Sequence, residues 1–306
     1  MSITIGVHRS NPSLYHLARL GLAERALAPL GETVTWHHYT DGTNTARLLA
    51  AGVIDLGGTG STPPLTGQAQ GHDIVYVAVS APRPGHGALL VAADGPVRTV
   101  ADLAGGTVVF GVGSWQTHLL AKALHEAGLS YADLVARRPA DDPTPPAERL
   151  AAGEIAGWVA QEAELAAARR AGGVRVLVET GSVISDRSVF FTRRDLAQQR
   201  PEVVAALVGA LQRADDWVAA HLDEAAGHAA AELGGEAADW HTALAGLPWR
   251  LESVPAAFVA EQQEAADIFV AAGYLDRPIT VADARVPALA PLVDAALAAV
   301  TPAGAR

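Results

Sequence analysis

The sequence predicts an α/β protein built from two lobes. Strand-like apolar runs alternate with helical patterns from the first residues onwards, and this alternation is typical of mostly parallel sheets with right-handed connections. The chain has 306 residues, which is more than one hydrophobic core usually organises. Half of the residues are hydrophobic and 18% are charged, so the chain has enough apolar material for two cores.

The first part of the chain predicts one lobe. Leu14, Leu17 and Leu20 recur at helical spacing behind an alternating run, which is typical of a strand followed by a helix. The predicted strands are residues 3–7, 33–39, 54–57 and 74–79. The predicted helices between them are residues 12–30, 45–51 and 63–70.

The alternation then restarts and predicts a second lobe. Its predicted strands are residues 88–92, 107–110, 155–159 and 174–179. Its predicted helices are residues 100–103, 117–127, 146–152 and 162–171. A strand at residues 189–192 then returns to the first lobe, and the rest of the chain is helical in pattern.

This order of segments predicts where the chain passes between the lobes. We expect lobe 1 to comprise residues 1–85 and 187–306, and lobe 2 to comprise residues 86–186. The two crossings, near residues 83–87 and 181–188, are expected to form a hinge.

Composition excludes several classes of function. The formal charge is −11 and there is no basic run, so a nucleic-acid partner is not expected. The chain has no cysteine, which excludes disulfides and thiolate chemistry. Neighbouring His37 and His38 point to opposite faces of a strand, and His118 and His125 lie two helical turns apart. We therefore expect no metal site and no cofactor, and the lack of a long apolar stretch predicts no membrane insertion.

The sequence at the amino terminus is relevant to the cellular location of the protein. The residues after Met1 alternate like a strand and lack the basic and apolar regions of a secretory signal. A cytoplasmic location is expected if this start is native, and a periplasmic or other extracytoplasmic location if a signal peptide was removed.

Residues 51–64, AGVIDLGGTGSTPP, resemble the signature of the nitrate-, sulfonate- and taurine-binding proteins of ABC importers. Further stretches that match this family in order are residues 100–106, 111–114, 124–129, 200–204 and 261–269. The resemblance implies a two-lobed, type II periplasmic-binding-protein fold, also called a Venus flytrap. It also implies that a small anionic organic molecule binds in the cleft between the lobes.

The predicted binding residues lie on loops that join strands to helices. The amino terminus of a helix attracts anions, so two such loops facing each other would hold a sulfonate or sulfate group without Lys or Arg. Each loop alone also fits an ordinary helix cap, and the facing pair favours a ligand. The predicted ligand-binding residues are Ser10, Asn11, Thr43, Gly60, Ser61, Thr62, Ser114, Trp115, Gln116, Thr117, Trp158 and Gln161.

The second-lobe wall departs from the family pattern. Trp158 is retained, but the acidic, aromatic and proline positions around it have changed. Asp41 is the first candidate for a general base, with His118 and His8 as alternatives, and Glu162 is a further carboxylate near the predicted cleft.

Two functions from different classes remain open at this point. The first is an intracellular enzyme that releases sulfate from a sulfate ester, or acts on a sulfonate, by elimination or internal displacement. It resembles the aziridine-forming enzyme of azinomycin biosynthesis, and a small partner protein would complete its pocket. The desulfinase relatives need a cysteine near Asn11, which is absent. The alternative is a sulfonate-, taurine- or nitrate-binding component that delivers its ligand to an ABC permease. The missing signal and the altered wall favour the enzyme.

Overall fold

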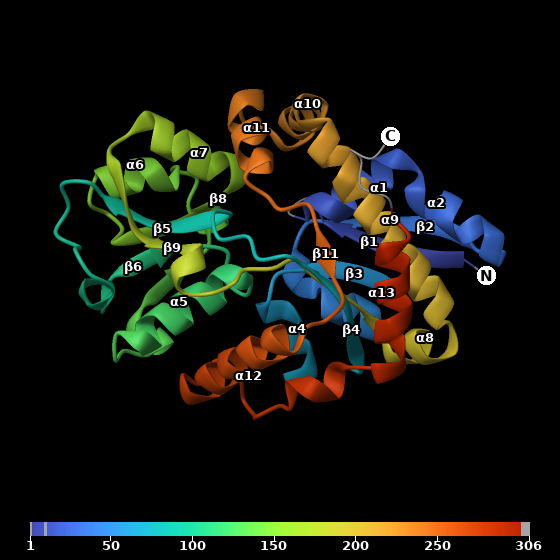
Figure 1. Ribbon diagram of the computed structural model, residues 1–306. Coiled ribbons are helices and arrows are strands. Elements are labelled where there is room, and N and C mark those ends of the chain that lie inside the picture. The colour runs from blue at the N-terminus through green and yellow to red at the C-terminus, as the bar shows by residue number, and fades with distance from the viewer. Residues whose placement is uncertain (1, 9–10, 301–306) are drawn as a thin grey trace.

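The computed structural model describes residues 2–8 and 11–300, and it contains two β-sheets, one in each lobe (Figure 1). The first-lobe sheet has the strand order β11-β4-β10-β3-β1-β2. Its strands are β1 (Ser2–His8), β2 (Thr33–Tyr39), β3 (Leu56–Thr59), β4 (Ile74–Ser80), β10 (Val189–Arg193) and β11 (Leu251–Glu252). The two-lobed α/β prediction is confirmed.

The second-lobe sheet has the strand order β7-β6-β8-β5-β9. Its strands are β5 (Gly87–Ala92), β6 (Thr107–Val109), β7 (Val135–Arg137), β8 (Gly157–Gln161) and β9 (Val174–Glu179). The short strand β7 was not predicted, because three residues are too few to show a period.

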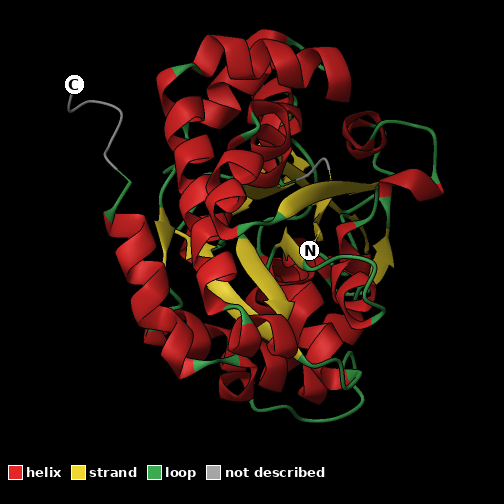
Figure 2. Cartoon of the chain, turned by 90° about the vertical axis from the view of Figure 1, so that its right-hand side faces the viewer, coloured by secondary structure: helices red, strands yellow, loops and turns green. Residues whose placement is uncertain are grey.

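Helices surround the strands, as the turned view shows (Figure 2). The helices of the first half are α1 (Pro12–Leu20), α2 (Leu22–Leu27), α3 (Thr45–Ala50), α4 (Thr62–Ala69), α5 (Trp115–Glu126), α6 (Pro146–Ala151) and α7 (Glu162–Ala171). Those of the second half are α8 (Arg194–Gln199), α9 (Pro201–Ala220), α10 (Leu222–Leu233), α11 (Ala237–Ala245), α12 (Ala256–Ala271) and α13 (Ala290–Ala298). Short 3-10 turns lie at Ala28–Leu30, Gly42–Asn44, Val100–Leu103, Tyr131–Asp133, Pro139–Asp141, Thr180–Ser182, Val281–Ala284 and Pro287–Leu289.

Two predictions about these elements are wrong. The helix predicted at residues 12–30 breaks at Gly21, whose φ of 60° is left-handed and ends α1. The sheets are mixed rather than mostly parallel, because β5 and β10 run antiparallel to both of their neighbours. These are the strands that follow the two crossings between the lobes, so the chain enters each sheet there in the reverse direction.

Alternation along strand β4 explains how the first lobe is packed. Every residue of β4 is buried, as expected for a strand covered on both faces. Val75 and Val77 belong to the core beneath α1, α2 and α9, whereas Ile74 and Tyr76 belong to the core beneath α3, α4 and α12. The two faces therefore anchor helices on opposite sides of the same sheet.

The two crossing segments lie side by side. The backbone N–H of Arg83 donates to the carbonyls of Ser185 and Asp186, at 3.0 and 2.9 Å. Gly181 N donates to Pro84 O at 3.0 Å. The lobe boundaries between residues 85 and 86 and between residues 186 and 187 stay a prediction, but both fall within these paired segments. Within residues 2–8 and 11–300, no helix has both the length and the apolar character needed to cross a bilayer.

Candidate functional site

A cavity of about 680 Å³ lies between the lobes. Its walls come from the ends of β1 and β3, the turn Gly42–Asn44, the loop before α5, the junction of β8 with α7, and the segment joining α10 to α11. The carboxyl ends of strands collect ligands in α/β proteins, and this volume suits a small organic molecule. Within residues 2–8 and 11–300, no group of three or more metal-ligating side chains lies close enough together to hold a metal ion.

Many of the predicted site residues meet at this cavity although they come from both lobes. Those that line it are His8, Asn11, Asp41, Thr43, Gly60, Ser114, Trp115, Gln116 and Gln161. Others lie behind its wall, and these are Ser61, Thr62, Thr117, His118 and Trp158. Ser10 lies outside the described residues.

Trp158 shows why one predicted wall residue is displaced. The strand was predicted at residues 155–159, but it runs from Gly157 to Gln161. Side chains alternate along a strand, so Val159 and Gln161 face the cavity while Trp158 points to the other side of the sheet. There it packs with Leu150 and Leu165, which makes Trp158 part of the core rather than of the cavity wall.

Asp41 begins the turn Gly42–Asn44 at the cavity wall. Its Oδ1 accepts hydrogen bonds from the backbone N–H and the hydroxyl of Thr43, at 3.0 and 2.7 Å, and its Oδ2 lies 3.5 Å from Arg138 of the second lobe. Burial raises the pKa of Asp41, but the Thr43 bonds and the Arg138 charge outweigh burial and lower the pKa overall. The Asp41 carboxylate is therefore ionised, caps the turn and is a weak proton acceptor.

His8 lines the cavity as a neutral ring. It is 5% exposed, and burial lowers its pKa, although the hydrogen bond to Gly58 opposes this. Its Nε2 lies 2.8 Å from the Gly58 carbonyl, so Nε2 carries the proton that is donated. The ring packs against Gly42, where a Cβ would come within 2.8 Å of it.

Trp115 joins the two lobes at the cavity. A Cβ on Gly60 of the first lobe would lie 2.6 Å from the Trp115 Cβ, and a Cβ on Gly87 would lie 2.4 Å from its ring. The indole Nε1 donates to Gln161 Oε1 at 3.0 Å, and Gln116 Nε2 donates to the same oxygen at 2.8 Å. Both glycines are needed because the indole occupies the space that side chains would fill.

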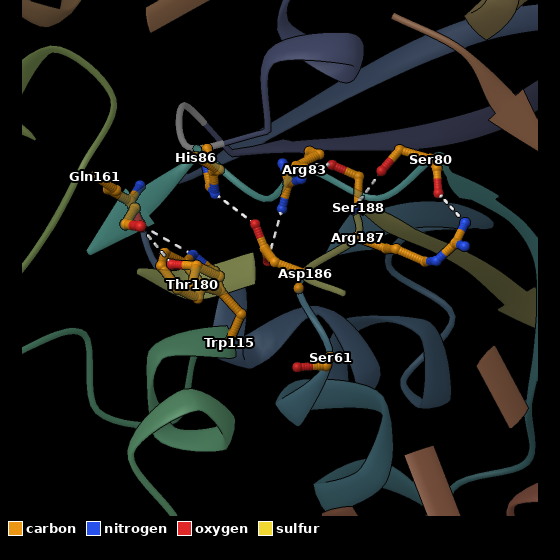
Figure 3. A network of polar contacts seen from close by, with 12 residues as sticks. Ser61, Ser80, Arg83, His86, Trp115, Gln161, Thr180, Asp186, Arg187 and Ser188 are labelled. Atoms are coloured by element: carbon orange, nitrogen blue, oxygen red, sulfur yellow. Dashed lines mark hydrogen bonds and ion pairs between the residues drawn. The ribbon is translucent and has the colours of Figure 1, made fainter. Parts of the chain in front are cut away.

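The sequence did not reveal a buried charged network at the back of the cavity (Figure 3). Asp186 accepts from Arg83 Nη2 at 3.0 Å through Oδ1 and binds His86 Nδ1 at 2.8 Å through Oδ2. Arg83 Nη1 also donates to Ser188 at 3.1 Å. Arg83 and His86 line the cavity and are 4% and 5% exposed, while Asp186 is 2% exposed. The sequence signals for this network were that all four residues lie in or beside the predicted crossings and that His86 falls near the predicted cleft.

Part of the cavity wall comes from the carboxyl-terminal half of the chain. Helix α11 lies beside α7 of the second lobe (Figure 1), where Ala163 packs with Trp240 and Leu244. Arg170 holds Asp239 through two hydrogen bonds of 3.1 and 2.6 Å. Sequence periodicity predicted helices here but gave no sign that they reach across to the other lobe.

Comparison with known proteins identifies the family of this chain. The family model described as NMT1/THI5 like matches residues 31–225, which is more than half of the chain. The chain belongs to the NMT1/THI5-like family. It is also 32% identical over 242 residues to a putative aliphatic sulfonates-binding protein of Escherichia coli (strain K12), covering 77% of this chain and 74% of that protein.

Solved structures agree with this family assignment. The periplasmic aliphatic sulphonate binding protein SsuA from Escherichia coli has a TM-score of 0.83 and 27% identity, covering 93% of this chain and 92% of that one. The alkanesulfonate-binding protein SsuA from Xanthomonas axonopodis pv. citri, bound to MOPS, has a TM-score of 0.79 and 28% identity, covering 93% and 98%. The desulfurization enzyme DSZB has a TM-score of 0.65 at 17% identity, covering 97% and 99%, and shares the fold alone.

One predicted catalytic residue of this NMT1/THI5-like chain connects the lobes instead of lining the cavity. His118 Nδ1 lies 3.0 Å from Ser61 Oγ in a buried hydrogen bond between α5 and the loop before α4. His118 is 2% exposed, and burial lowers its pKa from 6.5 to about 4. In this structure the His118 side chain holds α5 against the start of α4.

His118 should make the protein sensitive to acid. Because its folded pKa is lowered, the unfolded chain takes up the proton first, and stability is lost as pH falls from about 6.5 towards 4. The loss amounts to up to about 3 kcal/mol. His118→Gln should flatten this loss in urea unfolding measured between about pH 7 and about pH 4.5, whereas the exposed His125→Gln on the same helix should not. An unchanged pH slope in His118→Gln would contradict the assignment.

Proposed function

We propose that this protein binds an aliphatic sulfonate reversibly in the cavity between its lobes. The observation that carries the proposal is a small-molecule cavity whose polar walls come from both lobes, in a chain whose relatives are named for sulfonate binding. In this role the protein would act outside the cytoplasmic membrane, as the Escherichia coli protein named periplasmic does, and deliver its ligand to an ABC permease.

Hydrogen-bond donors at the cavity wall suit the anionic group. Asn11 Oδ1 accepts from Leu14 N at 3.0 Å, which leaves its amide nitrogen to donate towards the cavity. Helix α5 begins at the wall with Ser114 as its cap, so its positive end faces the ligand. The backbone of Gly60 also lines the cavity, next to Trp115. These groups would bind the sulfonate oxygens, while apolar wall groups such as Val159 contact the organic part.

The enzymatic hypothesis has less support. The relatives with the higher identities carry names for sulfonate binding, and the desulfurization enzyme shares only the fold. The geometry also disfavours two of the predicted bases: Asp41 is hydrogen-bonded and ion-paired, and His118 is bonded to Ser61. His8 donates through Nε2 to Gly58, so its Nδ1 remains able to accept a proton. A sulfate-releasing, aziridine-forming reaction therefore stands as the second function to test.

Calorimetric titration with a series of alkanesulfonates tests the proposal. We expect saturable one-to-one binding with a Kd of about micromolar, and no released inorganic sulfate when an amino sulfate ester is supplied. Inorganic sulfate at the same concentration measures how much affinity the organic part contributes. Absence of binding to every alkanesulfonate would overturn the binding proposal, and catalytic release of sulfate would establish the enzyme instead.

A further inference from the structure

Glu162 has an unusual backbone at the first position of α7. Its φ is 51°, in the left-handed region that residues with a side chain rarely adopt. Its backbone N–H donates to the His86 carbonyl at 3.1 Å, and Gln161 just before it is held by Trp115. The surrounding structure thus holds Glu162 in this conformation, which directs its carboxylate to the cavity wall beside His86.

The partner of this carboxylate is a buried imidazole. His86 Nδ1 is fixed by Asp186 at 2.8 Å, and Nε2 lies 3.5 Å from Glu162 Oε1. The groups facing His86 are Arg83, Asp186, Glu162 and the Trp115 ring, whose centroid lies 5.2 Å away. Burial and Arg83 lower the pKa of His86, but the two carboxylates outweigh them and raise it overall. Both ring nitrogens lie beside carboxylate oxygens, an arrangement that favours the doubly protonated ring.

The contact between His86 and Glu162 is long for a charge-assisted hydrogen bond. Such bonds are usually about 2.7–2.9 Å between nitrogen and oxygen. By contrast, the Asp186 contact to the same ring, at 2.8 Å, has the full strength of such a bond. Asp186 is also fully engaged by Arg83, so it is fixed, whereas the Glu162 side chain is the weaker and exchangeable partner.

We propose that Glu162 occupies an anion subsite in the cavity, and that the ligand's sulfonate displaces its carboxylate from His86 Nε2. The inference rests on the proposed sulfonate binding and deepens it. His86 would then be a direct ligand contact, held in orientation by Asp186. Glu162 would act as a competing internal anion that sets the affinity and is released into solvent when the ligand enters.

Neutralising Glu162 tests this proposal. In Glu162→Gln the competing charge is gone, so the affinity for an alkanesulfonate such as butanesulfonate should rise about 3- to 10-fold in calorimetric titration. Glu148→Gln is the matched control, since it removes the same charge from an exposed position on α6 of the same lobe, and its affinity should equal that of the wild type. An unchanged affinity in Glu162→Gln would overturn the proposal. A weaker affinity would also overturn it, because Glu162 would then be a ligand contact, for example to an ammonium group.

A second measurement keeps this test separate from the proposed function. The His86 ring signals can be followed by NMR while inorganic sulfate is added to both proteins. Sulfate should perturb the ring at concentrations about 3- to 10-fold lower in Glu162→Gln than in the wild type. If no alkanesulfonate binds but this difference is present, the function fails while the subsite stands. If sulfate leaves the His86 ring unchanged in both proteins, the subsite fails.

Discussion

Asp186→Asn should lower the free energy of unfolding by about 3–5 kcal/mol, because it leaves a buried Arg83 without its carboxylate. Arginine side chains stay charged in proteins, so the Arg83 guanidinium would remain a buried charge without a counter-charge. Asn is the right substitution because Asp186 has a φ of 39°, and Asn tolerates left-handed backbone. The loss would therefore report the charge pair rather than backbone strain.

The pH dependence of this effect follows from the same network. Asp186 has a lowered pKa, so its contribution is lost as pH falls through that value. His86 has a raised pKa, so its contribution is complete below its ordinary value and is lost as pH rises through the raised one. The difference between wild type and Asp186→Asn should be largest between about pH 4 and about pH 6.5.

Urea unfolding across this pH range measures both expectations. Glu179→Gln serves as the control, because it removes an exposed carboxylate that pairs with Arg169 at 2.8 Å. An exposed pair of this kind contributes about 0–1 kcal/mol. If Asp186→Asn were no more destabilising than Glu179→Gln, the buried network would not stabilise the hinge.

Gly60→Ala should weaken alkanesulfonate binding at least about tenfold, because the added methyl group would hold the lobes apart. A Cβ at this position would lie 2.6 Å from the Trp115 Cβ, an atom close to the backbone of α5 that cannot rotate away. Trp115 has no room to retreat, since its ring already lies against Gly87. The backbone of Gly60 is not left-handed, so alanine introduces no conformational strain there.

Small-angle scattering and calorimetric titration test this expectation together. Gly60→Ala should show a larger radius of gyration and a weaker affinity, with a small change in unfolding free energy, since the clash lies between lobes rather than in a core. Gly227→Ala is the control, because a Cβ at that helical position contacts nothing. Wild-type affinity and an unchanged radius of gyration in Gly60→Ala would show that the contact of Gly60 with Trp115 does not limit how closely the lobes approach.

The fold could be predicted because its signals are local. The buried run of β4 and the helical spacing of α1 follow from side-chain periods of two and 3.6 residues, which neighbours in the chain display by themselves. The predicted ranges of β2, α7 and β9 coincide with the structure for the same reason. Strand direction at β5 and β10 could not be read this way, because it depends on where the chain crosses between lobes.

The site was predicted only where it follows from strand ends. The loops carrying Asn11, Thr43, Gly60 and Ser114 follow strands whose carboxyl ends point to the same cleft, so the fold class already brings them together. Trp158 was misplaced because it was assigned from the family motif, whereas it lies an odd number of positions from Val159 and Gln161 and so falls on the opposite face of the strand.

The sequence by itself therefore determined a two-lobed α/β protein that resembles the nitrate-, sulfonate- and taurine-binding family, with polar loops from both lobes at one cleft. Only the tertiary structure decided which polar groups face the ligand and which hold the lobes. It pairs Arg83 with Asp186 and places Glu162 against His86, which are far apart in sequence. The physical reason is that periodicity reports one element at a time, whereas charged groups from distant segments come into contact only when both lobes have packed.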